Sequence, residues 1–241
     1  MPELEAENLS FKRRKKMVLD HVGCKISGIT GIAGPNGSGK STLLKLLAGV
    51  LKPDSGQVRY QQQDLAGVPD KVRAKMVAYL PQILPGNCAF RVTELLAMGR
   101  YAHGDMREEH PAVQQVLSVL ELEHLKDRRI DQLSGGEQRL VYLGLCLVTE
   151  SPVLLLDEPE AGLDLYHRQR LWEIILSSGR TVAVVSHDLA TLSQVCQKLI
   201  LLDHGKVCAE GDIREVLTPE TLSQVFHVGN AAQFDFSLSC K

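Results

Sequence analysis

The chain has 241 residues, of which 44 % are hydrophobic and 23 % charged, and its 27 basic and 29 acidic side chains give a formal net charge of −2. This length fits one domain, or a core with one insertion, and the apolar content excludes a wholly disordered chain. The balanced charge argues against a dedicated nucleic-acid binder, which normally carries a basic excess.

The sequence has no segment with the pattern of a signal peptide or a membrane span. Its start, Met-Pro-Glu-Leu-Glu, lacks the basic and then apolar shape of a signal peptide, and the longest apolar run covers only 140–148. A membrane span needs about 20 apolar residues. Six cysteines occur without a Cys-x-x-Cys pair, which indicates reduced side chains in a cytoplasmic protein. They stand at 24, 88, 146, 196, 208 and 240.

Strand and helix patterns alternate along the first part of the chain, which predicts an α/β fold with a mostly parallel sheet. An edge hairpin is expected to turn at the basic run 12–16, and a short apolar strand leads into a glycine-rich loop. The following helix has an apolar face at helical spacing that includes Val50. The expected elements are strands at 4–11, 18–26, 29–33 and 76–80 and a helix at 40–51.

The alternation stops at about residue 83 and returns after residue 150. The interval reads as a helical subdomain inserted into the sheet domain, with a loop at 85–87 and helices at 93–101, 111–125 and 136–149. The chain then resumes with strands at 153–157, 181–186 and 198–203, a hairpin turn at His204-Gly205, and helices at 165–177, 189–196 and 220–226. Thr218 is the expected N-cap of the last helix, with Pro219 at its first position.

Residues 34–41 read Gly-Pro-Asn-Gly-Ser-Gly-Lys-Ser and fit the phosphate-binding pattern G-x-x-x-x-G-K-[ST] in full. Glycines let the backbone form a nest of N–H groups, and the helix that follows presents its positive end to phosphates. Lys40 is expected to reach the outer phosphates, and Ser41 offers its hydroxyl to Mg²⁺. The residues predicted to bind nucleotide are Gly34, Pro35, Asn36, Gly37, Ser38, Gly39, Lys40, Ser41 and Thr42. Kinases, GTPases and ATPases all use this loop, so the motif leaves the reaction open.

An apolar strand at 153–157 ends in two acids, at the edge of a parallel sheet where ligands bind. Asp157 is placed to hold Mg²⁺ through water, and Glu158 to polarise the attacking water as a general base. Gln82 ends another strand and could sense the γ-phosphate or Mg²⁺. His187 follows a further strand and could donate a hydrogen bond to the γ-phosphate, although a lone histidine there is more often structural.

A second glycine motif, Leu-Ser-Gly-Gly-Glu-Gln at 133–138, opens the last helix of the insertion. Ser134 can act as its N-cap, and Gly135 and Gly136 allow the backbone to approach an anion closely. One nucleotide hardly needs two phosphate-type helix starts from one subunit. The simplest solution is a head-to-tail pair of subunits in which each gives one motif to a shared ATP.

Taken together, these motifs resemble the nucleotide-binding subunit of ATP-binding cassette (ABC) transporters, and they occur in the family order over almost the whole chain. Residues 133–138 resemble the family's signature motif, with Glu137 in place of the usual glutamine. Residues 34–41 and 153–157 are similar to its Walker A loop and Walker B strand. The remaining matches are the catalytic glutamate at Glu158, the Q-loop at Gln82, the switch histidine at His187 and a D-loop at 161–164.

The resemblance implies one ABC ATPase domain over 1–241, with a P-loop ATPase core at 1–82 and 151–241, an N-terminal antiparallel β part and the insertion at 83–150. It implies ATP and Mg²⁺ as cofactors, and hydrolysis that drives transport. The implied site residues are Glu158, His187, Lys40 and Gln82 for catalysis, Ser41, Gln82 and Asp157 for the metal, and Ser134, Gly135, Gly136, Glu137 and Asp164 for the nucleotide.

The partners that the resemblance implies are a second ATPase subunit, polytopic permease subunits and an external solute-binding protein, with no nucleic acid. It places the chain peripherally at the cytoplasmic face of the cell membrane. Three departures stand out. The aromatic residue that the family usually places on adenine has only Phe11 as a candidate, Leu140 and Leu145 stand where arginines are common, and the D-loop has Ala161 and Gly162 without a serine.

Two stretches, 91–103 and 215–228, resemble importers of iron–siderophore, haem and cobalamin, and zinc and manganese importers share parts of the first. An importer of a metal chelate is therefore the expectation. The alternatives are the ATPase subunit of a zinc or manganese importer and a soluble ABC ATPase of the iron–sulfur assembly type. An exporter half would normally be fused to membrane spans, and a P-loop kinase would explain neither the signature motif nor the insertion.

Overall fold

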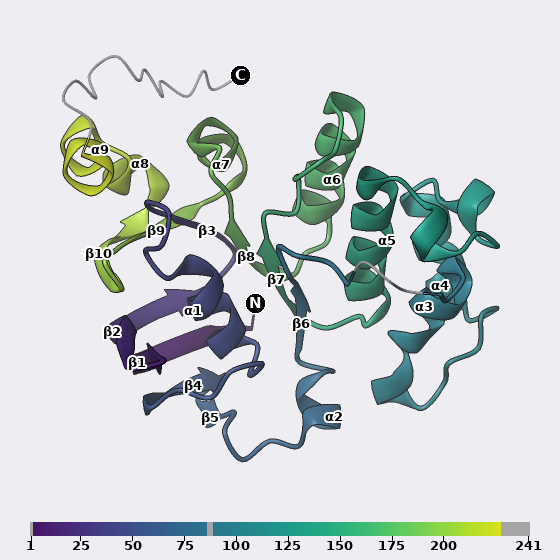
Figure 1. The fold of residues 1–241 in the computed structure, drawn as a ribbon, viewed down its shortest axis with the longest axis horizontal. Coiled ribbons are helices and arrows are strands. Elements are labelled where there is room, and N and C mark those ends of the chain that lie inside the picture. Colours follow the sequence, from purple (N-terminus) through teal and green to yellow (C-terminus); the bar gives the residue numbers. More distant parts are fainter. Residues whose placement is uncertain (1, 86–88, 228–241) are drawn as a thin grey trace. The chain divides into compact units, whose positions relative to one another are not determined.

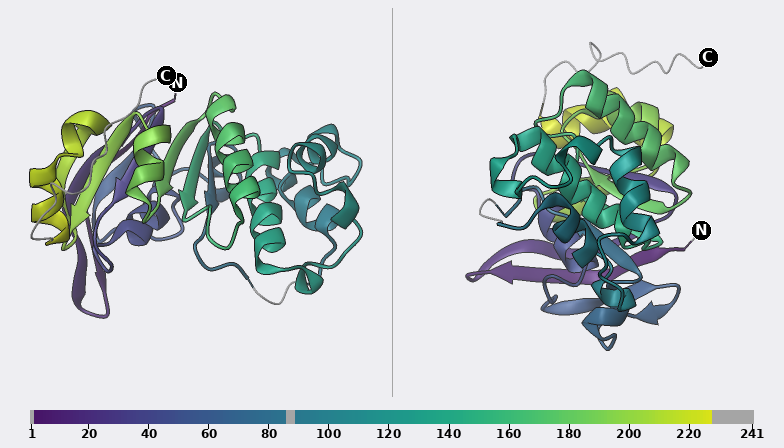
Figure 2. Two further views of the ribbon diagram at one scale, coloured as in Figure 1. Left: turned by 90° about the horizontal axis from the view of Figure 1, so that it is seen from above. Right: turned by 90° about the vertical axis from the view of Figure 1, so that its right-hand side faces the viewer.

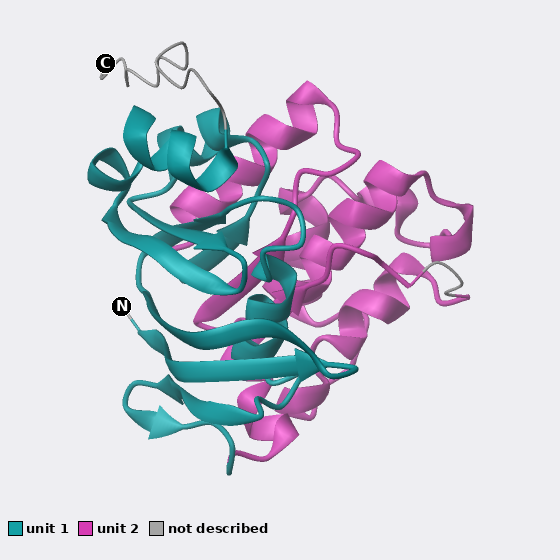
Figure 3. Cartoon of the chain, turned by 60° about the vertical axis from the view of Figure 1, so that its left-hand side comes forward, with its two compact units in different colours: residues 1–67, 180–241 teal, residues 68–179 magenta. Residues whose placement is uncertain are grey.

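The structure is a computed structural model that describes residues 2–85 and 89–227. The chain forms two compact units, unit 1 with residues 1–67 and 180–241 and unit 2 with residues 68–179 (Figure 3). Part of the predicted loop at 85–87, Cys88, Cys240 and the end of the 215–228 stretch lie outside the described residues. The predicted insertion at 83–150 stays a prediction, because compactness of packing does not show where one segment was inserted into another.

Unit 1 contains a four-stranded antiparallel sheet in the order β2-β1-β4-β5 (Figure 1). The expected hairpin is present, but β1 pairs on both sides, with β2 and with β4, so of the two hairpin strands β2 alone lies at an edge of this sheet. Arg14 and Lys15 form its turn, each with positive φ (48° and 69°), as a tight hairpin of this hand requires. The strands are β1 (Leu4–Arg13), β2 (Lys16–Ile26), β4 (Ser55–Tyr60) and β5 (Gln63–Asp64).

A second sheet of unit 1 has the order β10-β9-β3-β8, in which β8, β3 and β9 run parallel and β10 returns antiparallel to β9. All residues of β3 and β8 are buried, as expected for strands covered on both faces. The strands are β3 (Ile29–Ala33), β8 (Thr181–Val185), β9 (Lys198–Asp203) and β10 (Lys206–Asp212).

Four helices complete the described part of unit 1: α1 (Lys40–Leu47), α7 (Leu189–Val195), α8 (Ile213–Val216) and α9 (Pro219–Phe226). Helix α1 packs against strands of both sheets, and α8 and α9 lie beside β9 (Figures 1 and 2). The prediction of a helix to residue 51 is wrong, because α1 ends at Leu47 and Gly49 adopts a left-handed conformation (φ 70°). Val50 is consequently 60 % exposed and does not belong to the apolar face.

Unit 2 contains two parallel strands, β6 (Val77–Leu80) and β7 (Val153–Asp157), and a group of helices. Helix α5 packs against α3 and α4, and Gly144 permits this, since a Cβ there would lie 3.0 Å from side-chain carbons of Leu96 and Val116. The helices are α2 (Asp70–Arg73), α3 (Val92–Met98), α4 (Pro111–Val119), α5 (Gly135–Val148) and α6 (Leu165–Ser177). The predicted helix 111–125 is wrong in its length, because Glu121 has positive φ (56°) and only a short 3-10 turn follows.

Among residues 2–85 and 89–227, no helix is both long enough and apolar enough to cross a membrane. The four cysteines within this part of the chain, Cys24, Cys146, Cys196 and Cys208, form no disulfide, as the sequence predicts. Burial raises the pKa of the Cys24 thiol to about 12, with the nearby Glu210 and Glu5 adding to the shift. Cys24 is therefore an unreactive core residue.

Candidate nucleotide-binding and hydrolysis site

The glycine-rich loop joins β3 to α1 within unit 1 and curls around the side chain of Lys40. Lys40 is only 6 % exposed, and its Nζ donates to the carbonyl oxygens of Gly34 (2.7 Å) and Pro35 (2.9 Å). The Ser38 hydroxyl is also buried and has no hydrogen-bond partner among the described residues. A buried cation and an unsatisfied hydroxyl at the start of a helix are groups that a phosphate would satisfy.

The turn between β9 and β10, with the end of β9, contacts the backbone of this loop. The Gly205 N–H donates to the carbonyl oxygen of Ser38 at 3.1 Å. At Gly34, where φ is 147°, a Cβ atom would lie only 1.9 Å from the carbonyl oxygen of Leu202. Gly34 is thus required by a contact between segments far apart in the sequence, in addition to its place in the motif.

Strand register places His187 at the same edge of the unit 1 sheet as the phosphate loop. Ile32 of β3 pairs with Val185 of β8 in parallel, so Gly34 and His187 each stand two residues beyond that pair. Phe11, the predicted adenine partner, lies on β1 opposite Leu19, and a Cβ on Gly39 of the loop would lie 2.6 Å from the Leu19 side chain. The roles of His187 and Phe11 stay predictions.

The acidic strand end and the Q-loop lie together in unit 2. Leu80 of β6 pairs with Leu156 of β7 in parallel, so Gln82 and Glu158 each follow that pair by two residues. Asp157 is fully buried (0 % exposed), whereas Gln82 is exposed and Glu158 is half-buried with a positive φ of 52°. The predicted proton acceptor therefore has access to solvent on a distorted turn.

Tyr79 stands beside the Asp157 carboxyl at this strand end. Burial, followed by the Asp157 charge, raises the pKa of the Tyr79 phenol well above its usual range. Tyr79 therefore remains a neutral phenol at physiological pH and adds no negative charge to the acidic cluster.

Arg139 joins the acidic strand end to the Q-loop, and sequence reasoning did not single it out. It lies in the first turns of α5, is only 3 % exposed, and its guanidinium donates to five backbone carbonyls in two segments of unit 2. These are the carbonyls of Pro81 and Gln82 (both 2.9 Å), Asp157, Glu158 and Pro159. The only signal in the sequence is that Arg139 stands at the edge of the apolar run 140–148. A cation buried there needs several hydrogen-bond acceptors, which the sequence does not identify.

The charge of Arg139 is opposed by its burial and supported by neighbouring acids. Desolvation lowers the pKa of the guanidinium, and the Asp157, Glu160 and Glu158 carboxylates act in the opposite direction. An arginine stays protonated in this balance. Leu140, the next residue, is buried in the core, so the cation in this helix turn occupies position 139.

The signature motif forms the capped start of α5. The Ser134 hydroxyl accepts from the Glu137 N–H (3.3 Å), and the Glu137 carboxylate accepts from both the N–H and the hydroxyl of Ser134 (each 2.7 Å). These hydrogen bonds hold the pKa of Glu137 below its usual range, the one from the Ser134 hydroxyl contributing most. Glu137 therefore places a negative charge at a helix start predicted to bind an anion.

The D-loop lies against the signature motif within unit 2. A Cβ on Gly136 would lie 3.0 Å from the carbonyl oxygen of Gly162, so the two backbones approach closely. Asp164 caps α6, and its carboxylate accepts from the backbone N–H of His167 (2.9 Å) and lies 2.8 Å from the His167 Nδ1. The backbone N–H of His167 is the main cause of the lowered pKa of Asp164. Unit 2 thus brings the Q-loop, the acidic strand end, the D-loop and the signature motif together, with Arg139 and Gly136 as the points of contact.

A parallel α/β sheet with a glycine-rich loop between a buried strand and a helix defines a P-loop nucleotide-binding protein. The family model of the ABC transporter matches residues 21–161, more than half of the chain. The chain therefore belongs to the ABC transporter family and is an ATPase of that family.

Similar proteins cover nearly the whole length of the chain. It is 37 % identical to the hemin import ATP-binding protein HmuV of Pseudomonas aeruginosa, over 92 % of both chains. It is 32 % identical to a siderophore transport system ATP-binding protein of Bacillus subtilis, over 94 % of this chain and 86 % of that relative. Among solved structures, an ABC transporter assigned to the metal-chelate type, in an inward-facing conformation, matches with a TM-score of 0.79 and 27 % identity over 95 % of this chain and 90 % of that chain.

Proposed function

We propose that this chain is the ATP-hydrolysing subunit of an importer for iron chelates, such as haem or ferric siderophores. Two relatives with 32 % and 37 % identity are described by name as import or transport subunits for siderophores and hemin. The single observation that carries the ATPase part is the glycine-rich loop itself, in which the buried Lys40 ammonium and the unsatisfied Ser38 hydroxyl sit at the start of a helix. Nothing in the sequence or the fold favours the zinc, manganese or iron–sulfur alternatives over this one.

In this proposal the loop residues 34–42 hold the phosphates of ATP, with Lys40 on the outer phosphates and Phe11 against the adenine. Ser41, Gln82 and Asp157 supply hydroxyl, amide and carboxylate oxygens, a donor set that suits Mg²⁺. An ion held there would supply positive charge against the phosphates. The complete burial of Asp157 fits a carboxylate that binds a cation in place of water.

Glu158 accepts a proton from the water that attacks the γ-phosphorus, and the bond from that phosphorus to the oxygen of ADP breaks. Its partial exposure gives the carboxylate access to water, while the Arg139 contact to its carbonyl holds its backbone. His187 donates a hydrogen bond to the γ-phosphate. Gln82 senses the γ-phosphate or Mg²⁺, and its position changes that of the exposed segment that follows β6.

A second subunit completes the proposed site. Ser134, Gly135, Gly136, Glu137 and Asp164 would face the nucleotide bound by the partner's phosphate loop, in a head-to-tail dimer. Further proposed partners are polytopic permease subunits and an external solute-binding protein. The chain would work peripherally, at the cytoplasmic face of the cell membrane.

The test compares Glu158→Gln with Glu173→Gln, an exposed glutamate on α6 that pairs with Arg170 at 3.1 Å. Glu158→Gln should bind ATP with unchanged affinity and hydrolyse it about 100-fold more slowly, as expected for a lost general base, whereas Glu173→Gln should match the wild type. Tagged Glu158→Gln, solubilised gently with ATP, should then co-purify a polytopic membrane protein. Near-normal turnover would remove Glu158 from its role, and soluble partners alone would favour a non-transport ATPase.

A further inference from the structure

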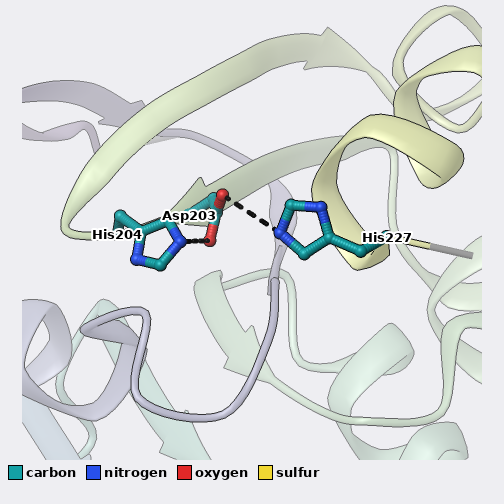
Figure 4. Close-up of side chains that lie close together, drawn as sticks. All are labelled: Asp203, His204 and His227. Atoms are coloured by element: carbon teal, nitrogen blue, oxygen red, sulfur yellow. Dashed lines mark ion pairs between the residues drawn. The ribbon is translucent and has the colours of Figure 1, made fainter.

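Three metal-ligating side chains meet in unit 1, outside the residues assigned to ATP. Asp203 ends β9, His204 is the first residue of the turn to β10, and His227 follows the end of α9. Figure 4 shows the two imidazole rings on either side of the Asp203 carboxylate, each facing one of its oxygens. The His204 Nε2 lies 3.7 Å from Asp203 Oδ1, and the His227 Nε2 lies 4.0 Å from Asp203 Oδ2.

These separations are too long for hydrogen bonds but are close to those of ligands that share a cation. With metal–ligand bonds of about 2.1 Å, two ligand atoms lie about 3.0 Å apart at a right angle and about 3.6 Å apart at 120°. One ligand atom from each residue lies within 4.8 Å of the others. The widest of these separations exceeds the 120° value by at most about 1.2 Å, which movement of the two exposed histidine side chains would close.

The local backbone tolerates histidine at both positions but does not require it. His204 (φ 44°) and His227 (φ 55°) both adopt the left-handed conformation, where glycine and asparagine are the common residues. Lys206, the first residue of β10, pairs with Asp20 at 3.1 Å. Asp203 thus faces two imidazoles, and Lys206 of the same hairpin pairs with the Asp20 carboxylate instead of with Asp203.

We propose that Asp203, His204 and His227 bind one divalent transition-metal ion of the zinc type, with water in the remaining positions. Two imidazole nitrogens and one carboxylate suit Zn²⁺ or Fe²⁺, whereas Mg²⁺ and Ca²⁺ prefer oxygen ligands alone. The bound ion would link α9 to the β9–β10 turn.

This link has a consequence for the phosphate loop. The same turn holds that loop through the Gly205 N–H, and Leu202 one residue before Asp203 contacts Gly34. A metal ion at the turn would therefore stabilise the segment on which the loop rests. The proposal concerns metal binding alone and does not depend on the transported solute or on hydrolysis.

The experiment uses the full chain, freed of metal by a chelator and without nucleotide. Zn²⁺ is titrated by calorimetry and followed by thermal unfolding, and Co²⁺ absorption reports the ligand geometry. The ligand variants are His204→Asn and His227→Asn, because asparagine tolerates the left-handed backbone. His21→Asn is the matched control: His21 lies 3.7 Å from Asp20 and has φ 51°, but no second histidine completes that pair among the described residues.

The expected result is one Zn²⁺ per chain, a raised unfolding temperature with Zn²⁺, and affinity at least about tenfold weaker in each ligand variant. His21→Asn should bind as the wild type does. Asp203→Asn provides a third test if one histidine variant folds poorly. The proposal is overturned if the wild type binds no Zn²⁺, or if the ligand variants bind it as tightly as the wild type.

Discussion

Replacing Arg139 tests whether this residue holds the Q-loop and the acidic strand end of unit 2 together. Arg139→Met keeps most of the side-chain volume and removes every donor. The five carbonyls that the guanidinium contacts belong to two segments, 81–82 and 157–159, which carry the predicted Q-loop and the acidic strand end. Without Arg139, these buried or partly buried carbonyl groups lose their shared cation, and the acids beside it lose their counter-charge.

The magnitude follows from burial and from the number of bonds. One hydrogen bond to a charged group contributes about 1.5–3 kcal/mol, but burying the guanidinium carries a desolvation cost that offsets part of the sum. Breaking a buried charged network by removing one member costs about 3–5 kcal/mol. For a chain of this size, that corresponds to a fall of roughly 6–20 °C in the unfolding temperature.

The assay is thermal and urea unfolding of Arg139→Met, Arg139→Lys and Arg129→Met, together with ATP turnover. Arg129 is the matched control, since it lies in unit 2 in an exposed ion pair with Asp131 (2.6 Å). Its loss should cost no more than about 1 kcal/mol. Arg139→Lys keeps the charge but cannot reach five carbonyls at once, so its stability should lie between the wild type and Arg139→Met.

Turnover separates a positioning role from a purely structural one. At a temperature where all variants are folded, Arg139→Lys should lower kcat while KM for ATP stays near its wild-type value, because the phosphate loop in unit 1 is unchanged. An unfolding free energy of Arg139→Met within about 1 kcal/mol of the wild type would refute the energetic argument. A kcat unchanged in Arg139→Lys would restrict the residue to stability.

Two further predictions concern the helix starts. Gly34→Ala places a Cβ 1.9 Å from the Leu202 carbonyl oxygen and should destabilise the chain by about 3 kcal/mol or more in urea unfolding. The control is Gly37→Ala, at φ 80° with no atom close to its added Cβ, which should cost only about 1–2 kcal/mol. Equal costs for the two substitutions would show that the contact with Leu202 is not responsible. The folded pKa of Glu137 is lowered, chiefly by Ser134, so its contribution is present above the unfolded pKa and is lost as pH falls through the folded pKa. The urea midpoint should therefore fall less between pH 7 and about pH 3 in Glu137→Gln than in the wild type, and parallel curves would show that this carboxylate does not contribute.

Local patterns predicted the elements that depend on local rules. The buried strands before the phosphate loop and before Asp157, the capped start of α9 at Thr218 and Pro219, and the basic turn at 12–16 all follow from hydrophobic periodicity, capping and turn chemistry. The errors are at helix ends. α1 stops at Leu47 and α4 at Val119, because left-handed residues after them end the hydrogen-bond pattern while the apolar spacing continues.

Contacts between distant segments could not be predicted from the sequence. Nothing near Gly34 indicates that Leu202 lies against it, and nothing near Gln82 indicates that Arg139 donates to its carbonyl. Strands β4 and β5 were also missed, since they carry few apolar residues and depend on pairing with β1 and with each other. The tertiary structure decides these features, and the local sequence does not.

Arg139 and the β9–β10 segment both contact backbone atoms of the motifs and not the motif side chains. Arg139 contacts the carbonyls of Gln82 and Glu158, the β9–β10 turn contacts the carbonyl of Ser38, and Leu202 of β9 lies against the backbone of Gly34. Motif side chains can therefore match a family completely while their geometry depends on residues outside the motifs. Since a displacement of about 1 Å can cost about 100-fold in rate, substitutions at Arg139 or in the β9–β10 turn should impair hydrolysis although every motif residue is intact.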